Sequence, residues 1–70
     1  MSGPTITGRE KEVLLLIAAG NSTQEAADLL FVSKKTVAFH LANIYDKLQV
    51  NNRVQALNKA RRLGLIEAVS

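Results

Sequence analysis

The stretch Ser33-Lys34-Lys35-Thr36-Val37-Ala38-Phe39-His40-Leu41-Ala42-Asn43-Ile44-Tyr45-Asp46-Lys47-Leu48 decides the fold of this 70-residue chain. Ser33 suits a helix N-cap, because its hydroxyl can accept a hydrogen bond from a free amide of the first turn. Apolar residues then recur every three or four positions, which predicts a helix over 34–48 with one buried stripe. The stripe consists of Val37, Leu41, Ile44, Tyr45 and Leu48. The opposite side begins with lysine and continues in small side chains, so it can lie close to another large surface.

Further helix caps flank this stretch on both sides. Two capping boxes, each a hydroxyl residue with glutamate three positions later, precede it, and an asparagine with glutamine three positions later follows it. Glycines stand where helices should end in a left-handed residue. The caps are Thr7 with Glu10, Ser22 with Glu25, and Asn52 with Gln55, and the glycines are Gly20 and Gly64. We therefore expect an all-α, compact four-helix domain, with helices at about 8–19, 23–30, 34–48 and 53–63.

The second and third expected helices are joined by only three residues, 31–33. A short helix, a tight turn and a longer helix form a helix-turn-helix, whose second helix enters the major groove of DNA. We expect Phe31 and Val32 to fill the space between the two helices. In the last helix the apolar spacing predicts that four residues pack inward and that a short apolar tail folds back. The inward residues are Ala56, Leu57, Ala60 and Leu63, and the tail is Leu65 and Ile66.

Length and composition limit the chain to one small domain without metal or disulfide support. It contains no cysteine and a single histidine, His40, so a zinc site is not expected and we predict no cofactor. No apolar run approaches the roughly 20 residues needed to cross a bilayer, and no secretion signal is visible. We expect a cytoplasmic protein that does not contact the membrane. Residues 1–4 are interpreted as a flexible N-terminal remnant or linker, 5–66 as the domain and 67–70 as a C-terminal tail.

Charge is distributed unevenly along the chain. Residues 34–62 hold seven basic and one acidic residue, a balance of +6, whereas residues 1–33 hold two basic and four acidic residues, a balance of −2. Such an asymmetry suits a polyanionic partner. A solvated surface that is merely rich in lysine is the alternative explanation of the charge. Because the sequence has no cysteine, one histidine, no glycine-rich phosphate loop and no pair of carboxylates that the expected fold would place around a pocket, we do not expect an enzyme.

Taken together, five segments resemble the LuxR-type DNA-binding domain over almost the whole chain. They are Thr7-Gly8-Arg9-Glu10-Lys11-Glu12-Val13-Leu14, Gly20-Asn21-Ser22-Thr23-Gln24-Glu25-Ala26-Ala27, Val32-Ser33-Lys34-Lys35-Thr36-Val37-Ala38-Phe39-His40-Leu41, Ile44-Tyr45-Asp46-Lys47-Leu48 and Asn52-Arg53-Val54-Gln55-Ala56. The resemblance implies a bacterial transcription regulator that binds double-stranded DNA through the helix at 34–48. It also implies a homodimer on DNA through the helix at 53–63, and an N-terminal regulatory domain that is absent from these residues.

The resemblance assigns DNA-binding roles to particular positions. The expected contacts are Lys34, Lys35, Thr36, Ala38, Phe39, Ala42, Asn43, Lys47 and Arg53, with Lys34 nearer the buried side than Lys35. Ala38 departs from the family pattern, which often places lysine or another polar residue there. Because alanine cannot make a bidentate base contact, direct readout should be sparse, leaving apolar contacts, an amide contact from Asn43 and DNA shape. A helical protein-interaction module with attenuated DNA binding is therefore the alternative function.

A second stripe on the last helix, Val54, Asn58 and Arg61, is the predicted dimerisation surface. A mixed solvated face is the alternative. His40 is interpreted as a packed, hydrogen-bonded structural residue rather than a ligand or a base.

Overall fold

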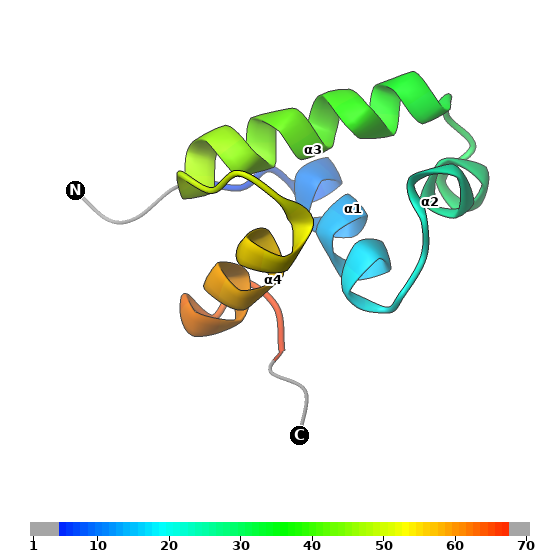
Figure 1. Ribbon diagram of the computed structural model, residues 1–70. Coiled ribbons are helices and arrows are strands. Elements are labelled where there is room, and N and C mark those ends of the chain that lie inside the picture. Colours follow the sequence, from blue (N-terminus) through cyan, green and yellow to red (C-terminus); the bar gives the residue numbers. More distant parts are fainter. Residues whose placement is uncertain (1–4, 68–70) are drawn as a thin grey trace.

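The computed structural model describes residues 5–67, which form four helices in chain order (Figure 1). These are α1 (Gly8–Ala18), α2 (Thr23–Leu30), α3 (Lys34–Leu48) and α4 (Arg53–Arg62). The predicted all-α four-helix fold is confirmed, although α1 and α4 each end one residue earlier than expected because Ala19 and Leu63 are their C-caps. Residues 1–4 and 68–70, interpreted above as linker and tail, lie outside the described residues.

Each helix begins at a side-chain cap that the sequence predicts. The capping residues Thr7, Ser22, Ser33 and Asn52 accept hydrogen bonds from the amides of Glu10, Glu25, Thr36 and Gln55, at 2.9–3.1 Å. Both capping boxes are complete, because each glutamate accepts in return from the amide of its N-cap residue. In α4 the return contact differs, since Gln55 accepts from the amide of Asn51 rather than that of Asn52.

The helix ends combine expected and unexpected left-handed residues. Gly20 and Gly64 have φ of 101° and 76°, as their placement predicts. Phe31 and Gln49 also adopt a left-handed backbone, each with φ of 58°, as the C-caps of α2 and α3.

The prediction that Phe31 fills the space between α2 and α3 is wrong, because its side chain is 94% exposed. The left-handed turn directs it away from the core. Val32 alone is half-buried against the core, and its amide donates to the carbonyl of Ala27 at 3.0 Å.

One hydrophobic core joins all four helices, with α3 lying across α1 and α4 and reaching α2 at its N-terminal end (Figure 1). The stripe predicted on α3 is confirmed: four of its members are buried and Tyr45 is half-buried against them. The buried apolar residues are Val13, Leu14, Ile17, Ala26, Ala27, Val37, Leu41, Ile44, Leu48, Ala56, Ala60 and Ile66. Close approach of α2 and α4 to their neighbours follows from the alanines, which add little side-chain bulk.

On α4 the inward face is narrower than predicted. Ala56 and Ala60 are buried and Leu57 is half-buried, but Leu63 is 46% exposed. The prediction for Leu63 is wrong because it follows the last helical residue. The expected return of the apolar tail is confirmed: Ile66 is buried and Leu65 is half-buried.

Candidate nucleic-acid interface

The face of α3 opposite the core is open over most of its length. Lys34, Lys35, Ala38, Phe39 and Ala42 are all exposed, and Phe39 retains 64% of its surface. Thr36 and Asn43 are half-buried at the edges of this face. Lys34 and Lys35 are both exposed, and Lys34 lies on the side of the buried stripe, three positions before Val37, as the sequence predicts. Apart from Lys34 and Lys47, the predicted contact residues on α3 therefore occupy one side of a 15-residue helix.

The N-terminal turn of α3 is strongly electropositive. Ser33 Oγ caps the amide of Thr36 and lies 2.9 Å from the Thr36 hydroxyl, while two lysines and no acidic residue occupy the first turn. Lysines at a helix N-terminus oppose the helix dipole, so they do not stabilise the isolated helix. Their charge and the dipole instead act together on an anion placed at this end, which is where a phosphate would be held.

Apolar atoms dominate the middle of the exposed face. Ala38 and Ala42 lie one turn apart, with Phe39 beside them. The ring of Phe39 stands edge-to-face against the imidazole of His40, with 5.9 Å between the ring centroids. His40 is half-buried, as expected of a packed residue, but its imidazole makes no hydrogen bond among the described residues and contacts the ring of Phe39 instead. This part of α3 suits contact with thymine methyl groups better than hydrogen bonding to bases.

Arg53 extends the basic surface to α4. Its guanidinium Nη2 donates to the hydroxyl of Thr23 at 3.3 Å, which links the N-terminal turns of α2 and α4. Both residues lie in first turns, where free amides and the helix dipole also favour an anion. No pattern in the sequence predicts the contact of Thr23 with Arg53, because 30 positions separate the two residues.

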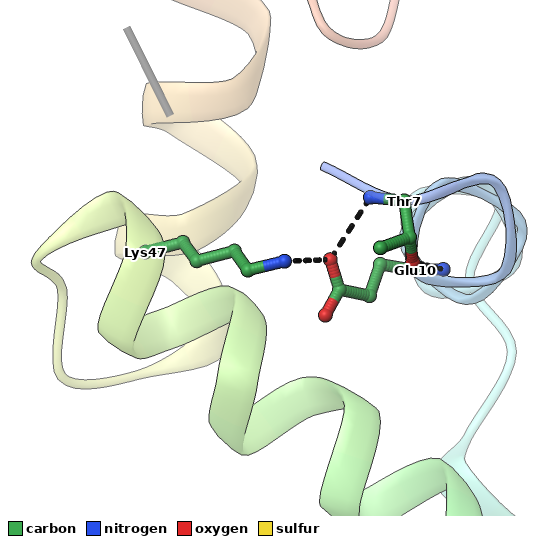
Figure 2. Close-up of polar contacts among 3 residues, drawn as sticks. All are labelled: Thr7, Glu10 and Lys47. Carbon is green, nitrogen blue, oxygen red and sulfur yellow. Dashed lines mark hydrogen bonds and ion pairs between the residues drawn. The ribbon is translucent and has the colours of Figure 1, made fainter. Parts of the chain in front are cut away.

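Lys47 is directed away from the exposed face and into an ion pair (Figure 2). Its Nζ donates to Glu10 Oε1 at 2.6 Å, and the same oxygen accepts from the amide of Thr7 at 3.0 Å. Burial by itself raises the pKa of Glu10, but the hydrogen bonds and charge supplied by Lys47 and Thr7 bring it below its ordinary value. The ammonium of Lys47 is thus committed to holding the C-terminal end of α3 against the start of α1.

The predicted dimerisation stripe lies on one side of α4. Val54 is 68% exposed, Asn58 is exposed and Arg61 is half-buried. The Nε of Arg61 is buried, and it has no hydrogen-bond partner among the described residues. Val54 and Asn58 are therefore open to a second molecule, whereas Arg61 is partly covered by its own chain.

Other kinds of site find little support in the part of the chain that the structure describes. Residues 5–67 bring together no group of three or more histidine or carboxylate side chains that could hold a metal ion. None of the helices in this range has both the length and the apolar character needed to cross a bilayer.

Comparison with known proteins places this geometry in a family. Residues 4–60 match the model of bacterial regulatory proteins of the luxR family. The spore germination protein GerE of Bacillus subtilis is 42% identical over 66 residues, which cover 94% of this chain and 89% of GerE. The response regulator VraR of Staphylococcus aureus is 47% identical over 62 residues, 89% of this chain but only 30% of VraR.

Solved structures agree with the sequence relatives. The Vibrio cholera VqmA-ligand-DNA complex contains a chain that superposes with a TM-score of 0.86 at 28% identity, over 99% of this chain and 30% of that one. This chain spans about a quarter to a third of the length of several curated relatives, VraR among them. The match over residues 4–60, the GerE relationship and the four-helix geometry show that the chain belongs to the LuxR family of bacterial regulatory proteins, as a helix-turn-helix DNA-binding domain.

Proposed function

We propose that this LuxR-family domain places α3 in the major groove of double-stranded DNA, with its exposed face toward the bases. The observation that carries the proposal is the division of α3 into a buried aliphatic stripe and an open face that begins with two lysines. The diameter of an α-helix fits the width of the major groove, and the N-terminal end of α3 brings positive charge to the phosphates.

The proposed contacts divide into phosphate-binding and base-facing residues. Lys34, Lys35, Thr36 and Arg53 bind phosphates, while Ala38, Phe39, Ala42 and Asn43 face the bases. Lys47 is left out of the phosphate set because its ammonium is paired with Glu10 at 2.6 Å. With methyl and phenyl groups in the centre of the face, sequence preference arises mainly from thymine methyls and DNA shape.

Titration with duplex DNA at two salt concentrations tests this proposal. The logarithm of the binding constant should fall with the logarithm of salt concentration by about 0.9 for each phosphate neutralised. Of the four proposed phosphate contacts, that of Thr36 is uncharged and the other three are cationic. The three cations give a slope near −3. If no duplex binds even at low salt while a protein partner does, the domain is instead a helical interaction module, an alternative favoured by Ala38 and Ala42.

The proposal extends to a homodimer on DNA. Pairing of two α4 helices through Val54, Asn58 and Arg61 would hold two α3 helices in successive major grooves, and the support for it is the exposed Val54 side chain. The stripe is small, so DNA or another domain is needed to bring the copies together. Analytical ultracentrifugation with a two-half-site duplex, compared with a single half-site, tests this pairing.

The domain is proposed to be the output end of a longer cytoplasmic transcription regulator. The support is the share of relatives that it covers, such as 30% of the response regulator VraR. Recovery of the complete coding sequence tests it, because a regulatory domain should then precede these residues.

A further inference from the structure

The end of α2 presents large apolar side chains to solvent. Phe31 is 94% exposed and Leu29 is 56% exposed, and they stand beside the exposed carboxylates of Glu25 and Asp28. We call these four residues the α2 knob. Leu29 follows Glu25 by one helical turn, so the apolar and acidic side chains share the outer side of the helix. The acidic charge sets the α2 knob apart from the basic face proposed for DNA.

The backbone at Phe31 shows that the isolated domain gains little from this ring. Its φ of 58° is left-handed, a conformation that a bulky side chain rarely adopts and that glycine takes without strain. Neither burial nor backbone preference therefore accounts for a phenylalanine here. A contact outside the molecule does account for it, since aromatic side chains often anchor small interfaces.

A complementary surface exists on the opposite part of the same chain. A shallow depression, open to solvent, lies beside α4 and the turn that precedes it. Its lining residues are Gln49, Val50, Gln55, Asn58, Lys59 and Arg62. We call this the α4 hollow. Val50 is its apolar member and is half-buried against the core, while Lys59 and Arg62 supply positive charge. Only Asn58 is shared with the stripe proposed for α4 pairing.

We propose that the α2 knob of one molecule inserts into the α4 hollow of a second copy of this chain. Phe31 would contact Val50 and the cationic groups, which are attracted to the face of an aromatic ring. Glu25 and Asp28 would meet Lys59 and Arg62. Because α2 lies at the N-terminal end of α3 and α4 lies under its C-terminal half, the α2 knob and the α4 hollow belong to different ends of the molecule (Figure 1).

This contact is head-to-tail, because it joins different surfaces of the two copies. Such a contact does not close on itself as a two-fold pair does, so it can repeat along a row. On the proposed function, copies at neighbouring DNA sites would bind cooperatively where the spacing of the sites brings the α2 knob of one copy to the α4 hollow of the next.

Mixing two variants tests the contact without DNA. Phe31→Asn removes the ring from the knob and keeps a residue that tolerates the left-handed backbone, leaving the hollow intact. Arg62→Glu reverses an exposed charge in the hollow and leaves the knob intact. Each variant alone should self-associate about tenfold more weakly than the unmodified domain, whereas their mixture can form one knob-in-hollow contact.

The measurement is the amide spectrum of one isotope-labelled variant while the unlabelled variant is added. The added variant reaches about 1 mM, a concentration at which a small and weak interface is populated. Labelled Phe31→Asn should show saturating shifts around Val50 and Lys59, and labelled Arg62→Glu should show them around Leu29. A double variant, Asp28→Lys with Arg62→Glu, should regain self-association because the charges are exchanged. Thermal melts establish that each variant is folded.

The proposal is overturned if neither mixture shows amide shifts and the spectrum of the unmodified domain does not change with its concentration. Shifts confined to Val54 and Arg61 also overturn it, because they identify two-fold α4 pairing instead. DNA binding is judged separately: Phe31→Asn should bind a single-site duplex as the unmodified domain does. A loss of the head-to-tail contact therefore leaves the proposed function standing.

Discussion

The ion pair between Lys47 and Glu10 should contribute substantially to the stability of the domain. The change Lys47→Met removes the ammonium 2.6 Å from Glu10 Oε1 and keeps an unbranched apolar side chain of similar reach. Glu10 then retains only its hydrogen bonds with Thr7, while its side chain remains 95% covered. The variant thus leaves a buried carboxylate without its counter-charge.

The size of the effect follows from the burial of the two partners. Removing one partner of a fully buried pair costs about 3–5 kcal/mol, and an exposed pair contributes about 0–1 kcal/mol. Here the Glu10 side chain is 5% exposed but that of Lys47 is 32% exposed. We expect a loss of about 2 kcal/mol, which lowers Tm by roughly 8–16 °C in a domain of this size.

The effect should depend on pH in a definite direction. The pKa of Glu10 is held below its ordinary value of 4.5, so the unfolded chain binds more protons than the folded one as the pH falls through that value. The stability contributed by Glu10 is therefore complete at neutral pH and is lost as the pH falls through the lowered pKa. The difference between the variant and the unmodified domain should shrink accordingly at acidic pH.

Urea and thermal denaturation, followed by circular dichroism at pH 7 and at about pH 3, measure both effects. Lys11→Met is the matched control, because Lys11 is exposed on α1 and no ion pair holds it among the described residues. The reasoning is refuted if Lys47→Met is no more destabilising than Lys11→Met at pH 7. It is also refuted if the difference between the variants is the same at both pH values.

Four other changes test the remaining assignments. Lys35→Ala should weaken binding to every duplex and reduce the magnitude of the salt slope by about one unit, as measured by fluorescence anisotropy; an unchanged slope removes Lys35 from the phosphate contacts. Phe39→Ala should change the preference among sequences selected from a random pool more than overall affinity, and equal losses on selected and random duplexes would exclude a role in readout. Val54→Asp should leave the melting temperature nearly unchanged but impair occupancy of a two-half-site duplex, whereas normal dimeric occupancy would rule out the α4 stripe. Ser33→Ala should cost about 1 kcal/mol in urea unfolding by removing the cap from the Thr36 amide, and a loss below about 0.3 kcal/mol would contradict that role.

The sequence alone determined the helices and much of the face of α3. Caps at Thr7, Ser22, Ser33 and Asn52 act over three residues, and the apolar period of α3 is equally local. Both can be predicted because the interacting groups are brought together by the helix itself. The exposure of Phe39 follows from the same periodicity.

Only the tertiary structure decided the contacts between distant residues. Lys47 meets Glu10 across 37 positions and Arg53 meets Thr23 across 30, and nothing in local spacing distinguishes these pairs from other oppositely charged or polar residues. The size and apolar character of Phe31 predict burial, yet its own left-handed backbone at the C-cap of α2 turns the side chain outward. The hydrophobic effect favours burial of every apolar side chain and has no direction. The conformation of the backbone at each turn decides which of these side chains reach the core.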